Sequence, residues 1–121
     1  ENHSIVYALK CIFNLNNESS SISIMQVNNK DYSLEMIVLN NLAWLLIQPD
    51  SQADIDPLKA LEYSLKAIAS TSSPQAGFFD TKAAVLWHLK RKDEAIKAQE
   101  KAVQLDGSNP LYQQRLILYR Q

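Results

Sequence analysis

The sequence predicts an all-α fold in which antiparallel pairs of helices stack side by side. The first observation is compositional: only 2 of the 121 residues are glycine and 4 are proline, whereas a sheet protein needs many tight turns. The second is a segment that recurs along the chain. The third is a set of helix-starting and helix-ending residues between the apolar segments. A chain of this length forms about one domain around one continuous core.

A nine-residue segment occurs twice, at residues 60–68 and 95–103. In both copies an alanine, a branched aliphatic residue, a lysine and a second alanine occupy the same places. Each copy has helical spacing and follows another apolar helical segment, at 34–48 and 78–89 respectively. The repeating unit is therefore helix, turn, helix with a period near 34 residues, which is typical of stacked helical repeats.

Residues that begin and end helices lie where this unit needs them. Asp56 before Pro57 is a good N-cap followed by proline at the first helical position. Asp93 and Glu94 place carboxylates in a first turn, where the helix dipole favours negative charge. Gly107 follows the second copy, and we expect it to end that helix in the left-handed conformation.

The two ends of the chain are interpreted in the same way. Asn109 is expected to cap a final amphipathic helix that covers the last pair. Residues 16–30 are rich in Asn and Ser, so two alternatives stay open: a loop with a short helix, or part of a degenerate repeat. The expected helices are 3–14, 20–29, 33–48, 57–71, 76–90, 93–105 and 110–120.

The two units share a residue pattern. The first reads Leu39-x2-Leu42-Ala43-x2-Leu46 and then Ala60-x3-Ser64-x2-Ala67; the second reads Phe79-x2-Lys82-Ala83-x2-Leu86 and then Ala95-x3-Gln99-x2-Ala102. This pattern resembles the tetratricopeptide repeat (TPR) family, whose helices carry aromatic-x2-Leu-Gly/Ala-x2-Tyr and Ala-x3-Phe-x2-Ala. The resemblance covers about residues 36–108, and it departs from the family at Ser64, Lys82 and Gln99, where the family has large apolar residues.

Small residues give the pattern a physical reason. Paired helices approach closely only where their side chains are small, and one pair cannot bury its apolar face alone. We therefore expect alanines to lie between the two helices of each unit, and others to make room for the next helix. These are Ala43, Ala60, Ala83 and Ala95 within the pairs, and Ala67 and Ala102 toward the next helix.

The resemblance implies a right-handed superhelical array of antiparallel helix-turn-helix repeats, a TPR-like α-solenoid. It has two clear units at 36–74 and 75–108, a degenerate N-terminal helical unit at 1–35, and a capping helix at 109–121, all within one domain. Because the chain begins at Glu1 rather than Met, we expect it to be a fragment of a larger protein.

Charge and hydropathy argue against several functions. The net charge is −1, which gives no electrostatic case for a nucleic-acid partner. The most apolar stretch, 34–47, has 14 residues and contains Glu35, so it is too short for a membrane span of about 18–20 residues. No signal-peptide pattern is present, so the compartment is not assigned. Cytoplasm is the default, and export stays open if a longer chain carries a signal.

No group of residues predicts catalysis, a metal site or a cofactor. The sequence has no Gly-rich phosphate loop, nucleophile elbow, Cys-x2-Cys pair or His-Glu-x2-His motif. His3 and Cys11 would be about 12 Å apart along one helix, too far for a thiolate–imidazole pair. His88 has no second histidine nearby. The basic run at 90–92 is either a docking point for an acidic peptide, a phosphate or RNA, or an exposed turn, and we favour the turn.

We therefore expect a non-catalytic module that binds another protein or a peptide. In the family that the chain resembles, the first helix of each unit lines a concave face. The peptide-binding residues implied here are Asn40, Trp44, Gln48, Asp80, Ala84, Trp87 and His88. The alternative is a structural spacer or oligomerisation segment of a larger protein, whose export stays open. The open ends of a short array would also allow a weak homodimer.

The two tryptophans have two interpretations. As binding residues, Trp44 and Trp87 combine flat apolar area with neighbouring polar groups, a mixture that is common in binding hot spots. As core residues, they fill the space left where Ser64 and Gln99 replace the aromatic residue of the family pattern. The sequence leaves both interpretations open and slightly favours the core.

Overall fold

The computed structural model describes residues 34–49 and 54–121. These residues form five α-helices and no strand, which confirms the all-α prediction for this part of the chain. The helices are α3 (Leu34–Leu45), α4 (Pro57–Ala69), α5 (Ala76–His88), α6 (Lys92–Leu105) and α7 (Pro110–Arg120). The helices expected at 3–14 and 20–29 lie outside the described residues.

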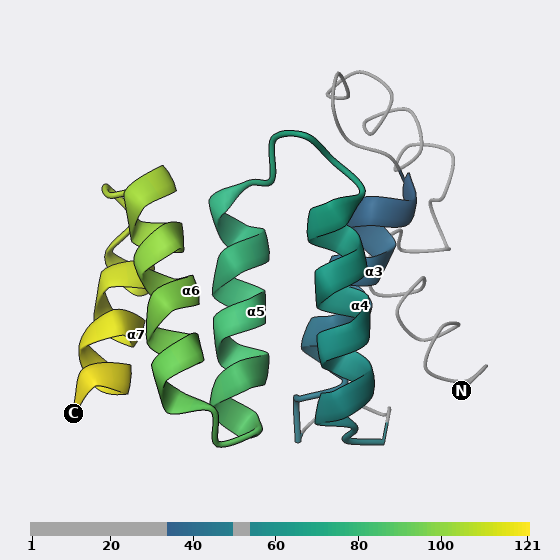
Figure 1. Ribbon diagram of the computed structural model, residues 1–121, viewed down its shortest axis with the longest axis horizontal. Coiled ribbons are helices and arrows are strands. Elements are labelled where there is room, and N and C mark those ends of the chain that lie inside the picture. Colours follow the sequence, from purple (N-terminus) through teal and green to yellow (C-terminus); the bar gives the residue numbers. More distant parts are fainter. Residues whose placement is uncertain (1–33, 50–53) are drawn as a thin grey trace.

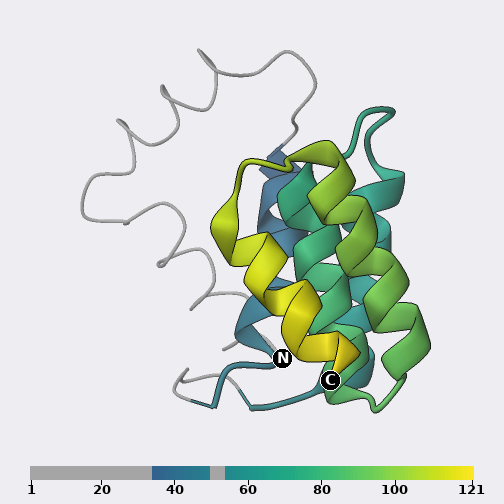
Figure 2. The same cartoon turned by 90° about the vertical axis from the view of Figure 1, so that its left-hand side faces the viewer.

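Successive helices run in opposite directions and pack side by side (Figure 1). The contacts join α3 to α4, α4 to α5, α5 to α6 and α6 to α7, and α3 also touches α5. In the view turned by 90°, α3 and α7 lie toward one side of the array and α6 lies toward the other (Figure 2). This arrangement brings helices of different pairs onto a common face.

The expected helix starts are within one residue of those observed. Asp56 caps α4 by accepting a hydrogen bond from the backbone N–H of Lys59 at 3.1 Å, and Pro57 follows it. Asn109 caps α7 in the same way through the N–H of Leu111 at 3.0 Å. These contacts satisfy backbone donors that have no partner inside the helix, so the short polar residues fix where each helix begins.

The expected helix ends extend further than the observed ones for α3, α4 and α5. After Leu45 the chain tightens: the N–H of Ile47 bonds to the carbonyl of Trp44 at 3.2 Å, and the N–H of Gln48 bonds to that of Leu45 at 3.2 Å. Bonds to the third preceding residue are typical of a last, tighter turn. The apolar pattern continues through this turn, which is why the expected helix extended to residue 48.

The prediction for Gly107 is wrong. No glycine among the described residues has a positive φ, and the residue that adopts the left-handed conformation is Lys90, with φ of 64°. Lys90 lies between α5 and α6, where only three residues reverse the chain direction. Such a short connection requires a left-handed residue just after the helix. After α6 the connection is longer, and the chain turns without one.

The alanines of the repeat pattern are completely buried. All six of them have a relative exposure of 0%: Ala43, Ala60, Ala67, Ala83, Ala95 and Ala102. Ala43 and Ala60 belong to a core cluster that joins α3, α4 and α5, and Ala83 and Ala95 belong to a second cluster that includes Tyr119 of α7. The small residues therefore lie between closely packed helices, as the repeat pattern predicts.

The two polar residues at the aromatic places of the pattern are also buried. Ser64 and Gln99 both have a relative exposure of 0%. Among the described residues the Ser64 hydroxyl and the Gln99 amide oxygen find no hydrogen-bond partner, whereas the amide nitrogen of Gln99 donates two hydrogen bonds. An unpaired buried hydroxyl costs stability, whereas a bonded amide organises its neighbours. Gln99 bonds to Asp80, one of the residues of the candidate site.

Candidate functional site

The residues predicted to form a concave face lie on α3 and α5 or directly after α3. Their exposure differs along that face. Asp80 and Ala84 are buried, His88 is exposed, and the others are partly exposed: Asn40, Trp44, Gln48 and Trp87. α3 and α5 are in contact, and Arg115 of α7 reaches a residue of each row, Trp44 and Asp80. The structure therefore brings the predicted rows together but covers part of the second row.

The helix that covers part of the second row is α7, which the sequence predicts only as a final helix over the last pair. The ring of Tyr119 stacks on the ring of Trp87, with centroids 4.6 Å apart and an interplanar angle of 21°. The guanidinium of Arg115 lies 5.2 Å from the centroid of the Trp44 ring. Arg115 and Tyr119 are one helical turn apart, so both contacts come from the same side of α7.

A signal in the sequence could have found these two residues. Arg115 is 35 residues after Asp80, and Tyr119 is 35 residues after Ala84. That interval is the spacing of the repeated segments. α7 also begins 34 residues after α5 begins. Extending the period by one more helix places Arg115 and Tyr119 on the same row as the predicted residues.

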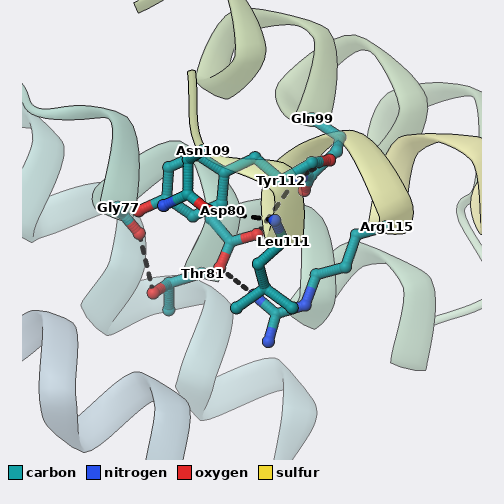
Figure 3. A network of polar contacts seen from close by, with 8 residues as sticks. All are labelled: Gly77, Asp80, Thr81, Gln99, Asn109, Leu111, Tyr112 and Arg115. Carbon is teal, nitrogen blue, oxygen red and sulfur yellow. Dashed lines mark hydrogen bonds and ion pairs between the residues drawn. The ribbon is translucent and has the colours of Figure 1, made fainter. Parts of the chain in front are cut away.

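Asp80 is the centre of a buried polar network (Figure 3). Its Oδ1 accepts a hydrogen bond from the side-chain amide of Gln99 at 3.0 Å. The same amide nitrogen donates to the backbone carbonyl of Tyr112 at 3.0 Å. Arg115 pairs with the other carboxylate oxygen of Asp80. The network ties α5, α6 and α7 together, because a buried carboxylate needs a charge partner and hydrogen bonds.

The replacement of an aromatic residue by Gln99 is therefore not a random loss. An aromatic ring at this place would bury apolar area but could not bond to the carboxylate of Asp80. Gln99 has a relative exposure of 0%, and its amide nitrogen donates to two acceptors on different helices, Asp80 of α5 and the carbonyl of Tyr112 of α7. Gln99 and Asp80 consequently depend on each other, and both depend on α7.

The same network perturbs the tyrosines of α7. Burial raises the pKa of Tyr119, and the negative charge of Asp80 raises it further, while Arg115 opposes the effect. Burial and Asp80 raise the pKa of Tyr112 in the same order. Both phenols are therefore neutral at physiological pH and act through their rings and as dipoles.

The partly exposed side chains on this side are Trp44, Trp87 and Arg115, and the buried ring of Tyr119 stacks on Trp87. We call these four residues the Trp–Arg face. Both indole rings are partly exposed and also pack against core clusters. Each tryptophan therefore contributes to packing and presents surface. Neither of the two interpretations from the sequence describes them completely, because each ring lies at the boundary between core and solvent.

The basic run at 90–92 is exposed along its length. Arg91 forms two hydrogen bonds to the carboxylate of Glu94, at 2.6 and 2.7 Å, and the ammonium of Lys92 donates to the backbone carbonyl of Gln121 at 3.0 Å. Two of the three cations thus have partners within the chain. The run forms the turn between α5 and α6.

Within the part of the chain that the structure describes, no group of three or more His, Cys, Asp or Glu side chains is placed to hold a metal ion. In the same part, no helix combines the length and the apolar character that crossing a membrane requires.

Comparison with known proteins adds no relative. No protein-family model matches the chain, and no curated protein and no solved structure matches it. The resemblance to tetratricopeptide repeats therefore depends on the residues and their spacing alone.

Proposed function

We propose that the chain is a non-catalytic module of tetratricopeptide type that binds another protein or a peptide through the Trp–Arg face. One observation carries the proposal: α7 contacts a partly exposed tryptophan on each of two other helices, through Arg115 over Trp44 of α3 and through Tyr119 stacked on Trp87 of α5. Tryptophan and arginine are enriched where binding energy concentrates, because they combine large apolar area with hydrogen-bonding capacity.

The geometry supports binding rather than catalysis. Arg115 already has its charge matched by Asp80, so it offers a flat guanidinium and apolar stem more than a free charge. The surface suits an apolar or aromatic segment of a partner, which would stack on Trp44 and Trp87. In the proposed architecture the array is a right-handed superhelix, and the face is its concave side.

The chain contains two tryptophans, and both belong to the Trp–Arg face. Their fluorescence therefore reports directly on this surface. Peptides selected from a displayed library on the wild-type protein should shift or quench this fluorescence. They should bind Trp44→Ala at least about ten times more weakly. The matched control is Leu58→Ala on α4, where a leucine that is 70% exposed is removed from a different surface.

Two outcomes contradict the proposal. One is that the selected peptides bind without any change in tryptophan fluorescence. The other is that Trp44→Ala and Leu58→Ala bind them equally well. Circular dichroism of both variants establishes that loss of binding does not arise from loss of fold.

One observation favours the alternative of a spacer or oligomerisation segment. The outer side of α7 exposes three large apolar residues, Leu111, Ile117 and Leu118, at 47%, 59% and 54%. Exposed apolar residues of this kind can stack on a second copy. Light scattering separates the two functions: a monomer favours the binding module, and a dimer that Leu118→Glu dissociates favours the spacer.

A further inference from the structure

A second surface lies between α5 and α6, on a different side of α5 from the Trp–Arg face. It is a groove of about 400 Å³. On α5 it is lined by Phe79, Lys82 and Leu86, which lie three and four residues apart and so share one side of the helix. Asp80 and Trp87 point to another side, toward α7. The groove is therefore independent of the surface proposed above.

The groove has an apolar floor and a basic rim. Phe79, Leu86 and Ala98 supply the apolar lining. The lysines of the rim are Lys82 on α5 and Lys97 and Lys101 on α6. Lys97 and Lys101 are exposed, one helical turn apart, and they also line an adjoining groove of about 560 Å³ between α6 and α7. Among the described residues none of the three lysines forms an ion pair.

The acidic residues beside the lysines are bonded to arginines. Glu94 lines the first groove, but both of its carboxylate oxygens bond to Arg91, at 2.6 and 2.7 Å. Glu100 lines the second groove, but it pairs with Arg120 at 2.7 Å. Each carboxylate thus bonds to an arginine, and none of the three lysines forms an ion pair with it.

The titration of Glu94 agrees with this arrangement. The hydrogen bond from Arg91 lowers the pKa of Glu94, and the charges of Lys82 and Lys97 lower it further against the opposing effect of burial. Lysines of both helices therefore act on the same point of the groove. A carboxylate placed there by a partner would meet the same positive potential.

We infer that this groove binds an acidic segment of a partner protein that also carries bulky apolar side chains. The carboxylates of such a segment would pair with Lys82, Lys97 and Lys101, and its apolar side chains would cover the partly exposed ring of Phe79. Charge complementarity selects the partner and speeds its association, and the apolar floor supplies contact area. A purely ionic ligand would leave the ring of Phe79 partly exposed, so we expect the segment to combine both kinds of residue.

The test uses a dye-labelled twelve-residue peptide that alternates glutamates with leucine and phenylalanine, followed by fluorescence anisotropy. Wild-type protein should bind it, and the double variant Lys97→Glu/Lys101→Glu should bind it at least about ten times more weakly. The matched control is Lys90→Glu/Lys92→Glu, which changes the net charge equally but alters the turn at 90–92. It should bind the peptide within about twofold of wild type.

Two further probes separate this inference from its alternatives. A peptide in which serines replace the apolar residues should bind several times more weakly than the first peptide. A single-stranded RNA of the same charge should bind more weakly than the first peptide as well. Raising the salt concentration should weaken the peptide complex, because the lysines are exposed.

The inference is overturned if the serine peptide or the RNA binds as well as the first peptide. It is also overturned if the two double variants behave alike, or if wild-type protein does not bind the peptide at all. Trp44→Ala should bind this peptide like wild type. A failure here therefore leaves the proposal for the Trp–Arg face unaffected, and the reverse also holds.

Discussion

Arg115 and Asp80 form an ion pair between α7 and α5, and they lie 35 residues apart in the chain. This interval is also the spacing of the two alanine-rich segments. Corresponding positions of successive first helices thus carry opposite charges and bond to each other. The pair fixes α7 on the rest of the array and holds Arg115 over Trp44. The Trp–Arg face therefore exists only while α7 is docked.

Removing Arg115 should destabilise the protein. In Arg115→Ala the carboxylate of Asp80, whose side chain is 9% exposed, keeps Gln99 but loses its charge partner. We expect the free energy of unfolding to fall by about 1–3 kcal/mol. Urea denaturation measures it. The control is Arg120→Ala, also on α7, whose partner Glu100 is half exposed. It should cost less than about 1 kcal/mol, and equal losses in the two variants would contradict the role given to Asp80.

The stacked pair of Trp87 and Tyr119 should show coupling. Trp87→Ala removes a ring that is only partly buried, so we expect a loss of about 2 kcal/mol, below the ~3–5 kcal/mol of a fully buried tryptophan. A double-mutant cycle with Tyr119→Leu should give an interaction energy of about 0.5–1.5 kcal/mol. Additive losses would show that the two rings, 4.6 Å apart, do not stabilise each other.

Overpacking should identify the close contact between α5 and α6. Ala95 is completely buried beside Ala83 and Leu86, so Ala95→Leu has no space for its larger side chain. The expected cost is about 1–3 kcal/mol, seen as a lower melting temperature. Ala69→Leu, at the exposed end of α4, is the matched control and should change the stability by less than about 0.5 kcal/mol. An unchanged melting temperature for Ala95→Leu would show that the helices pair in another register.

Replacing Lys90 by glycine should stabilise the protein. Its φ of 64° costs an L-residue energy that glycine does not pay, and its side chain is exposed. Lys90→Gly should therefore raise the free energy of unfolding by about 0.5–1 kcal/mol. The same substitution at Lys101, inside α6, should lower it by about 1 kcal/mol. If both variants are destabilised, the left-handed turn between α5 and α6 is not formed in solution.

Stability should fall at alkaline pH in part through Tyr119. Because its pKa is raised in the folded protein, the folded state retains the phenolic proton when the unfolded state has begun to lose it. The contribution is present in full below the unfolded pKa of about 10 and is lost as pH rises through the higher folded pKa. Tyr119→Phe keeps the ring and should show a smaller loss between neutral and alkaline pH in urea denaturation. An equal loss in wild type and variant would assign the effect elsewhere.

The helices were predictable because their signals are local. Asp56 and Asn109 bond to backbone groups within three residues of themselves, so the sequence places the starts of α4 and α7 correctly. The ends were less predictable, since Lys90 rather than Gly107 adopts the left-handed conformation. Which residue adopts the left-handed conformation depends on how sharply the chain must reverse between two packed helices. A local sequence pattern does not predict that sharpness.

The candidate face was predictable only in part. Helical spacing and the family resemblance selected Trp44 and Trp87, and both are partly exposed and contacted by side chains of α7. Arg115 and Tyr119 were not predicted as residues of this face, although the repeat period leads to both. Asp80 was expected on an open concave face, whereas it is buried and paired with Arg115.

The sequence by itself determined the helical class, the pairing of helices and the six buried alanines, since periodicity, capping and side-chain size act at short range. Only the tertiary structure decided what the exceptional residues do. Gln99 looks like a defect in the repeat, yet it bonds to Asp80 and to the backbone of Tyr112 on a different helix. The physical reason is burial: a carboxylate becomes a structural centre only where packing removes water and brings Gln99 and Arg115 to it from elsewhere in the chain.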